Sequence, residues 1–362
     1  MTYNLPKSNN LDIHSLTNIF KYVTNSYKYY WFYALLDELK KGNKEIDFRT
    51  MVIRMIAICW YPIIEFKLNL GNQDKLDRLV RYIHKNYGFK KDIKPDDLMG
   101  KIKNLEDKDL DNQIKYFYKY VPFRLLTPFF RNNIRGVKDH LKNNMIADLS
   151  YEKENAIYKI NEEDKKVIIN DRWFDYLLRN ISIVEGWVKY NLINYLQDRN
   201  PNVPAIPYKL EPAYQRKMNK QKKFWKEITK IIQLNDIYTG EIIKPKEISL
   251  DHFIPWSFVL HDKNWNLIPT FKSINSSKSD NLPELDRYFN DFADVQFRTF
   301  DLNRRKKIDK KLLEDYYMLD SQMDKNIKKG KFKEILEDNI YPLYRIARNT
   351  GFSIWDRNFS YY

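Results

Sequence analysis

The stretch DHFIPWSF, residues 251–258, places an acid next to a histidine at the end of a short apolar run that is typical of a β-strand. The chain contains only 5 histidines, so the pairing of Asp251 with His252 needs an explanation. One interpretation is a histidine with a structural role, in the core or on the surface. The other is a metal ligand next to a general base, and the rest of the sequence bears on both.

The composition indicates a chain with a substantial core. It has 362 residues, of which 43% are hydrophobic and 15% aromatic, enough for two domains or for one large domain with insertions. The single cysteine, Cys59, excludes an intrachain disulfide and any zinc site built from several cysteines. The N-terminal residues do not resemble a secretion signal, and the most apolar run, 51–66, contains Arg54, Pro62 and Glu65. We therefore expect a cytoplasmic protein that does not enter a membrane.

The net charge favours polyanionic partners. Lysine and arginine number 63 and aspartate and glutamate 48, which gives a formal charge of +15. Nucleic acid is the first candidate for such a partner and an anionic membrane surface the second, although basic proteins without either partner also exist.

The pattern along the chain predicts a mostly helical α+β protein. Residues 1–200 form a helical domain, with a short β-hairpin near 156–170 and a single helix over about 172–197. The aromatic residues of this domain are interpreted as core, with a recognition role as the alternative. Four prolines within 199–212 mark the best boundary. A catalytic domain over 212–285 and a helical region over 286–362 follow.

A strongly basic helix is predicted at the start of the second domain. Between residues 212 and 234 the chain carries seven basic residues against one acid, Glu227, a net charge of +6. Its predicted buried side consists of Phe224, Trp225, Ile228, Ile231 and Ile232. Two further basic runs begin at residues 304 and 325. The residues proposed to contact nucleic acid on this helix are Arg216, Lys220, Lys222 and Lys223.

Polar residues converge in the segment 236–283. Two β-like runs, 241–243 and 247–250, are expected to pair as a hairpin, and a helix is expected to begin near Ser273. Asp251 and Asn275 would supply a carboxylate and an amide oxygen, which suffice for Mg²⁺ when phosphate and water complete its shell. His252 has the chemistry of a general base near neutral pH. Lys278, one helical turn after Asn275, is expected to face the same phosphate.

This segment resembles an HNH, or ββα-metal, nuclease motif, and most closely the HNH domain of RNA-guided CRISPR endonucleases. The resemblance implies that Asp251 and Asn275 bind Mg²⁺ or Mn²⁺ and that His252 activates water. It also implies that Asn266 fixes the loop through backbone hydrogen bonds. The residues that carry it are Asp251-His252-x-x-Pro255-x-Ser257-Phe258, Asn266, Asn275-x-x-Lys278-Ser279-Asp280-Asn281-x-Pro283 and the turn Tyr238-Thr239-Gly240.

The sequence departs from many HNH proteins in having no paired cysteines for a structural zinc. The hairpin is therefore expected to have its own apolar core. His261 lies where the family uses no histidine and is expected on the surface. No second nuclease and no guide-binding lobe is found, so RNA guidance is not expected. The predicted core residues are Ile237, Ile242, Ile248, Phe253 and Trp256.

The catalytic segment is itself acidic. Residues 235–285 contain five lysines and seven acidic residues, a net charge of −2, so the grip on substrate is expected from the basic helix or the C-terminal basic runs. The leading hypothesis is a metal-dependent DNA endonuclease of bacterial restriction or anti-phage defence, with RNA as an open alternative substrate. The other hypotheses are a nucleic-acid-binding protein with an inactive HNH unit and an effector subunit that a partner activates. A homodimer or a protein partner is compatible with all of them.

Overall fold

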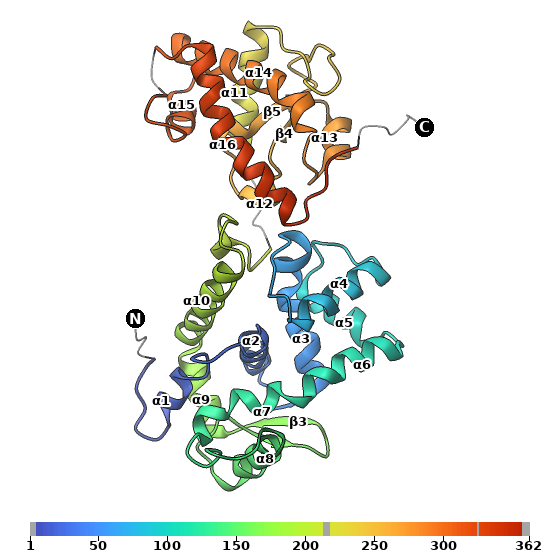
Figure 1. Cartoon of the computed structure of the whole chain (residues 1–362), viewed down its shortest axis with the longest axis vertical. Coiled ribbons are helices and arrows are strands. Elements are labelled where there is room, and N and C mark those ends of the chain that lie inside the picture. Colours follow the sequence, from blue (N-terminus) through green and yellow to red (C-terminus); the bar gives the residue numbers. More distant parts are fainter. Residues whose placement is uncertain (1–4, 213–217, 324–325, 357–362) are drawn as a thin grey trace. The chain divides into compact units, whose positions relative to one another are not determined.

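The computed structural model describes residues 5–212, 218–323 and 326–356. It divides into two compact units (Figure 1), one formed by residues 1–201 and 209–212 and the other by residues 202–208 and 213–362. Helices predominate and the strands are short, so the predicted α+β class is confirmed. None of the helices among the described residues has the length and apolar character needed to cross a membrane.

The first unit is a helical assembly around aromatic and aliphatic side chains. Its helices begin at recognisable caps: Asp47 accepts a hydrogen bond from the Thr50 amide at 2.7 Å, for example. The apolar run 51–66 is a buried α-helix that continues as a π-turn at Pro62. The helices are α1 (Ile13–Thr17), α2 (Tyr27–Lys40), α3 (Phe48–Trp60), α4 (Lys75–Tyr87), α5 (Pro95–Lys103), α6 (Lys108–Tyr116), α7 (Val121–Leu125), α8 (Lys142–Glu152), α9 (Asp171–Arg179) and α10 (Ile181–Arg199), with shorter turns η1 (Tyr61–Glu65), η2 (Phe117–Lys119), η3 (Thr127–Phe130) and η4 (Asp139–Leu141).

The predicted hairpin near 156–170 is confirmed, as strands β2 (Tyr158–Asn161) and β3 (Lys166–Ile169). A third strand, β1 (Glu45–Asp47), pairs with β3, so the sheet order is β1-β3-β2. The single helix expected over 172–197 is wrong, because Asn180 separates α9 from α10. The Asn180 side chain donates to the Tyr176 carbonyl at 2.9 Å and ends the first helix there.

The second unit contains the motif segment and the C-terminal helices. The segment forms a strand pair followed by a helix. The elements are η5 (Ile206–Tyr208), α11 (Asn219–Ile231), β4 (Ser249–His252), α12 (Trp256–Val259), η6 (Asn264–Asn266), β5 (Leu267–Thr270), α13 (Lys272–Lys278), α14 (Leu285–Lys306), α15 (Lys310–Tyr317) and α16 (Lys329–Asn349).

The strand pairing differs from the expected hairpin. β4 pairs antiparallel with β5, and Asp251 lies opposite Ile268. The run 241–243 makes only an isolated bridge between Asn235 and Ile242. The expected core is also wrong in part, because Ile242 is 53% exposed whereas Ile243 is buried. Successive side chains of an extended segment point to opposite sides, so only one of the two isoleucines can face the core.

Helix α14 and the C-terminal segment stabilise the strand pair in place of a zinc site. Phe253, directly after β4, stacks on Phe292 of α14 with ring centroids 4.0 Å apart. Gln296 of α14 donates to the Leu267 carbonyl of β5 at 2.7 Å. Trp355 packs edge-on against Tyr238. A small unit without metal or disulfide needs apolar area from elsewhere, and the C-terminal helices supply it.

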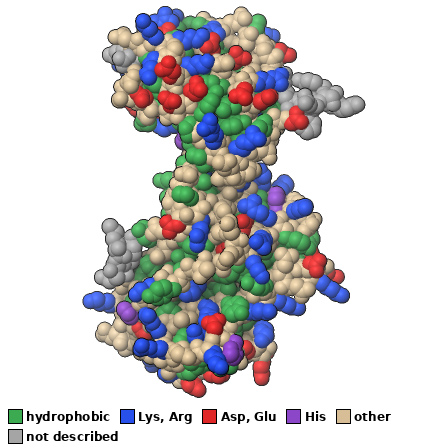
Figure 2. Space-filling model, in the orientation of Figure 1, with side chains coloured by type: hydrophobic (Ala, Val, Ile, Leu, Met, Phe, Trp, Pro, Cys, Tyr) green, Lys and Arg blue, Asp and Glu red, His purple; other side chains and the backbone are tan. Residues whose placement is uncertain are grey.

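On the face of the second unit visible in Figure 2, acidic and basic side chains are mixed rather than segregated.

Candidate active site

Asp251 is a buried carboxylate with a partner on each oxygen. It lies on β4 with 2% of its surface exposed. The Tyr238 hydroxyl donates to Oδ2 at 2.6 Å, and the Lys278 ammonium lies 3.0 Å from Oδ1. Burial, and next the charge of Asp251, raise the pKa of Tyr238 well above its ordinary value, which keeps the phenol a donor. The carboxylate is thus held in a fixed orientation.

Lys278 points toward Asp251 rather than outward. Its side chain is fully buried, and the ammonium also donates to the His252 carbonyl at 2.8 Å. The sequence prediction had this ammonium facing the substrate phosphate. The structure pairs it with the carboxylate because a buried Asp251 requires a nearby positive charge.

His252 follows Asp251 on β4 and has a different partner. Its Nε2 lies 2.9 Å from Oδ1 of Asp262, on the loop between α12 and η6. A carboxylate in this position accepts the hydrogen of one ring nitrogen and so orients the imidazole. Sequence reasoning missed Asp262, whose only signal was an acid on the loop that follows the Asp–His pair.

The loop that carries Asp262 is anchored from two helices. Gln221 of α11 donates to the Asp262 carbonyl at 3.2 Å. On the other side, Asp315 of α15 accepts from the Lys263 ammonium and from the Asn264 amide, both at 2.9 Å. The position of the His252 partner therefore depends on contacts of its loop with both α11 and α15.

His261 on the same loop is half-buried, so the expectation that it lies on the surface is wrong. Its ring lies 5.1 Å from that of Trp265. Burial is the main cause that lowers the pKa of His261 to about 4, followed by the electrostatic influence of His252 and Lys263. His261 is therefore neutral at pH 7.

Asn266 forms reciprocal hydrogen bonds with the backbone of Ile254. Its side-chain oxygen accepts from the Ile254 amide at 2.8 Å, and its side-chain nitrogen donates to the Ile254 carbonyl at 2.9 Å. Asn266 is fully buried. It thus fixes the chain directly after His252 and contacts no reacting group.

Asn275 lies on α13 against the strand that carries Asp251. Its amide nitrogen donates to Ser249 Oγ at 2.8 Å and to the Leu250 carbonyl at 2.9 Å. These bonds use both amide hydrogens, and the amide oxygen accepts no hydrogen bond from any described residue. The oxygen is therefore available as a ligand on the helix that packs against the strand of Asp251.

The donor set suits a hard cation with few protein ligands. Within the described ranges there is no group of three or more His, Cys, Asp and Glu side chains that could hold a metal. Asp251 and Asn275 offer one carboxylate and one amide oxygen, a set that Mg²⁺ accepts when water and phosphate complete the octahedron. Each Asp251 oxygen also keeps a lone pair beyond the one used by Lys278 or Tyr238. The residues fit a bound Mg²⁺ or Mn²⁺.

Asp236 connects the turn before β4 to the end of β5. It is fully buried, and its carboxylate accepts from the Tyr238 amide and from Thr270 Oγ1, both at 2.8 Å. Burial raises its pKa. Asp236 was also missed from the sequence, and it positions the tyrosine that holds Asp251.

Helix α11 presents its lysines to solvent. Lys220, Lys222 and Lys223 are exposed, whereas Arg216 lies outside the described residues. Of the predicted buried side, Ile231 is 41% exposed, which corrects that expectation at the last turn of the helix. The Lys220 ammonium lies 3.4 Å from Asp309, which brings α11 next to the basic stretch 304–311.

The antiparallel strand pair ends in an Asp–His dipeptide and is followed by a helix whose asparagine faces the strand, which is the arrangement that the resemblance to the ββα-metal motif implies. Residues 236–284 match the family model described as HNH endonuclease. This segment of the chain is therefore an HNH endonuclease domain, which supports nuclease activity and a nucleic-acid substrate. A comparison with curated proteins and one with solved structures gave no significant match.

Proposed function

We propose that the protein is a metal-dependent endonuclease that hydrolyses phosphodiester bonds in DNA, with His252 as general base and Asp251 and Asn275 as ligands of Mg²⁺ or Mn²⁺. The observation that carries the proposal is the arrangement around β4. Asp251, His252 and Asn275 are each fixed by hydrogen bonds, and each keeps an atom that can take part in the chemistry.

His252 is assigned to accept the proton of the attacking water through Nδ1. A neutral imidazole that donates its Nε2 hydrogen to Asp262 has Nδ1 as its remaining acceptor. Asp262 then stabilises the imidazolium that forms. Asn266 and the buried Pro255 fix the backbone beyond His252, so the ring has little freedom to leave this position.

Asp251 and Asn275 are assigned to hold the cation through one carboxylate and one amide oxygen. A bound Mg²⁺ stabilises the charge that develops on the phosphate and on the leaving oxygen. Tyr238 and Lys278 orient the Asp251 carboxylate and offset the cost of its burial. Lys278 is thereby a positioning residue, and its contact with phosphate remains a prediction.

Substrate binding is assigned to the lysines of α11 together with the stretch 304–311. The catalytic segment has a net charge of −2 and cannot attract a polyanion by itself. The bond from Gln221 to the Asp262 carbonyl places α11 against the loop that orients His252. A DNA strand that is bound to α11 thus reaches His252, the general base.

The test uses supercoiled plasmid, purified wild-type protein and Mg²⁺, with EDTA as one control. We expect nicking that EDTA abolishes and that His252→Ala reduces by about 10²- to 10⁴-fold. His140→Ala, at an exposed histidine of the other unit, is the matched control and should nick as the wild type does. Equal nicking by wild type and His252→Ala would show that the catalytic assignment is wrong. A parallel assay on single-stranded RNA distinguishes the two substrates.

The biological setting that we propose is bacterial restriction or anti-phage defence. It rests on analogy with other HNH proteins. Phage plating on cells that express the wild type or His252→Ala tests it. Equal plating efficiencies would speak against a defence role without affecting the assignment of the nuclease.

The ion pair between Lys278 and Asp251 favours a second candidate, an effector subunit that is silent until triggered. In this pair the Lys278 ammonium already offsets the charge of the carboxylate that is assigned as a metal ligand. A wild-type protein that nicks plasmid only after addition of a neighbouring gene product would support this candidate. Nicking by the purified chain with Mg²⁺ alone would exclude it.

A further inference from the structure

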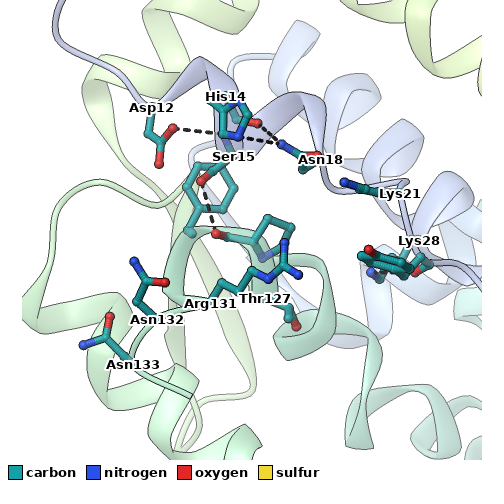
Figure 3. Close-up of a pocket in the computed structure, with 13 residues that line it drawn as sticks. Asp12, His14, Ser15, Asn18, Lys21, Lys28, Thr127, Arg131, Asn132 and Asn133 are labelled. Carbon is teal, nitrogen blue, oxygen red and sulfur yellow. Dashed lines mark hydrogen bonds between the residues drawn. The ribbon is translucent and has the colours of Figure 1, made fainter. Parts of the chain in front are cut away.

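The first unit has a cavity that the nuclease chemistry does not use. It measures about 430 Å³ and lies between α1 and the segment around η3. Figure 3 shows Arg131 between Asn132 and Asn133 on one side and Lys21 and Lys28 on the other. Three cations and several amides therefore line one hollow.

The wall of this cavity is fixed by one hydrogen bond between its two sides and by one within the cap of α1. Ser15 donates to the Pro128 carbonyl at 3.1 Å and so joins α1 to η3 (Figure 3). Asp12, the only carboxylate in the lining, caps α1 by accepting from the Ser15 amide at 2.9 Å. Its negative charge is thus partly used at the helix N-terminus, where it is favourable.

The cations of the cavity are available to a ligand. Neither Lys21 nor Arg131 has a carboxylate partner among the described residues, and both are exposed. Lys28 donates to the Ile19 and Tyr22 carbonyls at 3.2 Å each, which leaves one hydrogen of its ammonium unassigned. Burial, and next the charge of Arg124, lower the pKa of Lys28 to about 8, so it stays mostly protonated at pH 7 and gains from a bound anion.

A second cavity of about 410 Å³ adjoins the first and has a different character. The two share Tyr22, Lys28 and Thr127 in their linings. Five of the 13 residues in the second lining are aromatic, and two of them, Tyr22 and Tyr120, are 67% and 49% exposed. The Arg124 guanidinium lies 5.8 Å from the Tyr120 ring centroid and also donates to both oxygens of Asp139, a carboxylate of the same lining. Exposed rings next to a cation are a stacking surface for a flat, π-rich group.

We propose that these two adjoining cavities form a nucleotide-binding site in the first unit, with the base stacked on Tyr22 and Tyr120 and the phosphate held by Arg131 and Lys21. The arrangement matches the ligand in two respects. A nucleotide joins a flat ring to an anion, and the cavities join an aromatic lining to a cationic one. Each cavity also lies within the size range of small-molecule sites, about 300–1,000 Å³.

The nucleotide has two chemical sources, a free mononucleotide or the phosphorylated end of a single strand. Both present a base next to a phosphate monoester. Arg131 can bind two phosphate oxygens through its planar guanidinium, whereas Lys21 and Lys28 act as point charges. The recognised group is therefore the same, and a binding assay separates the sources.

The experiment measures binding to the full chain by isothermal titration calorimetry in EDTA, with the His252→Ala variant so that no probe is hydrolysed. The probes are AMP, ADP, adenosine, inorganic phosphate and a 5′-phosphorylated thymidine octamer. We expect AMP or the octamer to bind more tightly than adenosine or phosphate alone. Arg131→Ala and Tyr120→Ala should each weaken that binding by about tenfold or more.

Two matched variants test whether the loss is specific. Arg135→Ala removes an exposed arginine near Arg131 that does not line either cavity, and Tyr151→Ala removes a tyrosine that is 46% exposed elsewhere in the unit. Both should bind as the parent does. Binding of AMP alone assigns the site to a free nucleotide, and binding of the octamer alone assigns it to a strand end.

Several outcomes would overturn the site. These are no binding of any nucleotide probe, equal binding of phosphate and AMP, or equal losses in Arg131→Ala and Arg135→Ala. Plasmid nicking by Arg131→Ala with an intact His252 is measured in parallel. This separates the two proposals, because a failed nucleotide site leaves nicking unchanged and a failed nuclease assignment leaves binding in EDTA unchanged.

Discussion

The site around β4 and the basic helix α11 belong to the same unit but are built in opposite ways. In the site, Asp251 and Lys278 are 2% and 0% exposed and bind each other. On α11, the lysines point into solvent and only a few have a carboxylate nearby. The segment 235–285 carries a net charge of −2, whereas 212–234 carries +6. Catalysis and nucleic-acid binding are thus assigned to separate surfaces.

This difference determines how each region should respond to substitution. Removing one member of a buried polar network leaves its partner unpaired in a medium of low polarity, which has a large cost. Exposed lysines contribute small, similar amounts through long-range attraction, and salt weakens them. The four predictions below test this contrast, from the largest expected effect to the smallest.

The largest effect is expected from Lys278→Met. This substitution leaves the Asp251 carboxylate buried with Tyr238 as its remaining donor. We expect the second unit to lose about 3–5 kcal/mol of unfolding free energy. Hydrogen exchange of the peptides that contain β4 and β5 measures this loss without reference to the other unit.

Two controls accompany this prediction. Lys272→Met changes an exposed lysine of the same helix, α13, and should change the exchange rates very little. The double variant Asp251→Asn/Lys278→Met removes both charges and should recover most of the loss. If Lys278→Met and Lys272→Met lower the free energy of unfolding equally, then the buried ion pair does not make the site more sensitive to substitution than the exposed lysines of α11 are.

Asp262→Asn should produce the next largest effect, on the rate rather than on stability. The amide keeps the shape of the carboxylate but loses the charge that stabilises the His252 imidazolium. We expect kcat for plasmid nicking to fall by about 100-fold, with KM and DNA binding in EDTA unchanged. Asp262→Glu should restore part of the rate.

Asp291→Asn is the matched control, since Asp291 is exposed on α14 in the same unit. A merely structural role of Asp262 would lower DNA binding or the melting temperature together with the rate. In that case, the return of a carboxylate in Asp262→Glu would not restore the nicking rate. Either result would remove Asp262 from the assigned mechanism.

Charge reversal of Lys220, Lys222 and Lys223 should have a smaller effect, on affinity. We expect DNA binding in EDTA to weaken by about tenfold. The slope of log affinity against log salt should decrease by about 0.9 for each phosphate that the protein no longer neutralises. Nicking at saturating DNA should stay close to the wild-type rate, because no reacting group has changed.

The comparison triple is Lys328, Lys329 and Lys331, exposed lysines in the C-terminal basic run at the start of α16. Its reversal should leave the salt slope unchanged. If the α16 triple weakens binding and the α11 triple does not, then the substrate is held at the C-terminal run. The assignment of grip to α11 would be wrong.

The sequence predicted the residue types of the site better than their contacts. The roles expected of Asp251, His252 and Asn275 came from their residue types, and the role expected of Asn266 came from the resemblance to HNH nucleases. The pairing of β4 with β5 could not be read, because a four-residue strand that is buried on both faces shows no alternation.

Long-range contacts account for the other differences. Lys278 and Asp251 are 27 residues apart, and nothing in the pattern indicates that the ammonium turns inward. Asp262 resembles an ordinary surface acid of a polar loop until the fold brings it to His252. In the first unit, the two cavities are lined by residues from segments around 12–28 and 116–139, which no local pattern connects.

The smallest effect is expected at His261, on the loop that both regions contact. Its pKa is lowered to about 4, so between pH 6.5 and pH 4 the unfolded chain binds a proton at this position that the folded chain does not. Stability should therefore decrease as the pH falls through that window, by about 1 kcal/mol at pH 5 once the partial exposure of the ring is considered. His261→Gln should remove this pH dependence from hydrogen exchange of the 256–266 peptide, whereas His140→Gln should not. If the pH dependence of hydrogen exchange is unchanged in His261→Gln, then this loop responds to pH like the exposed surface of α11 rather than like the buried site.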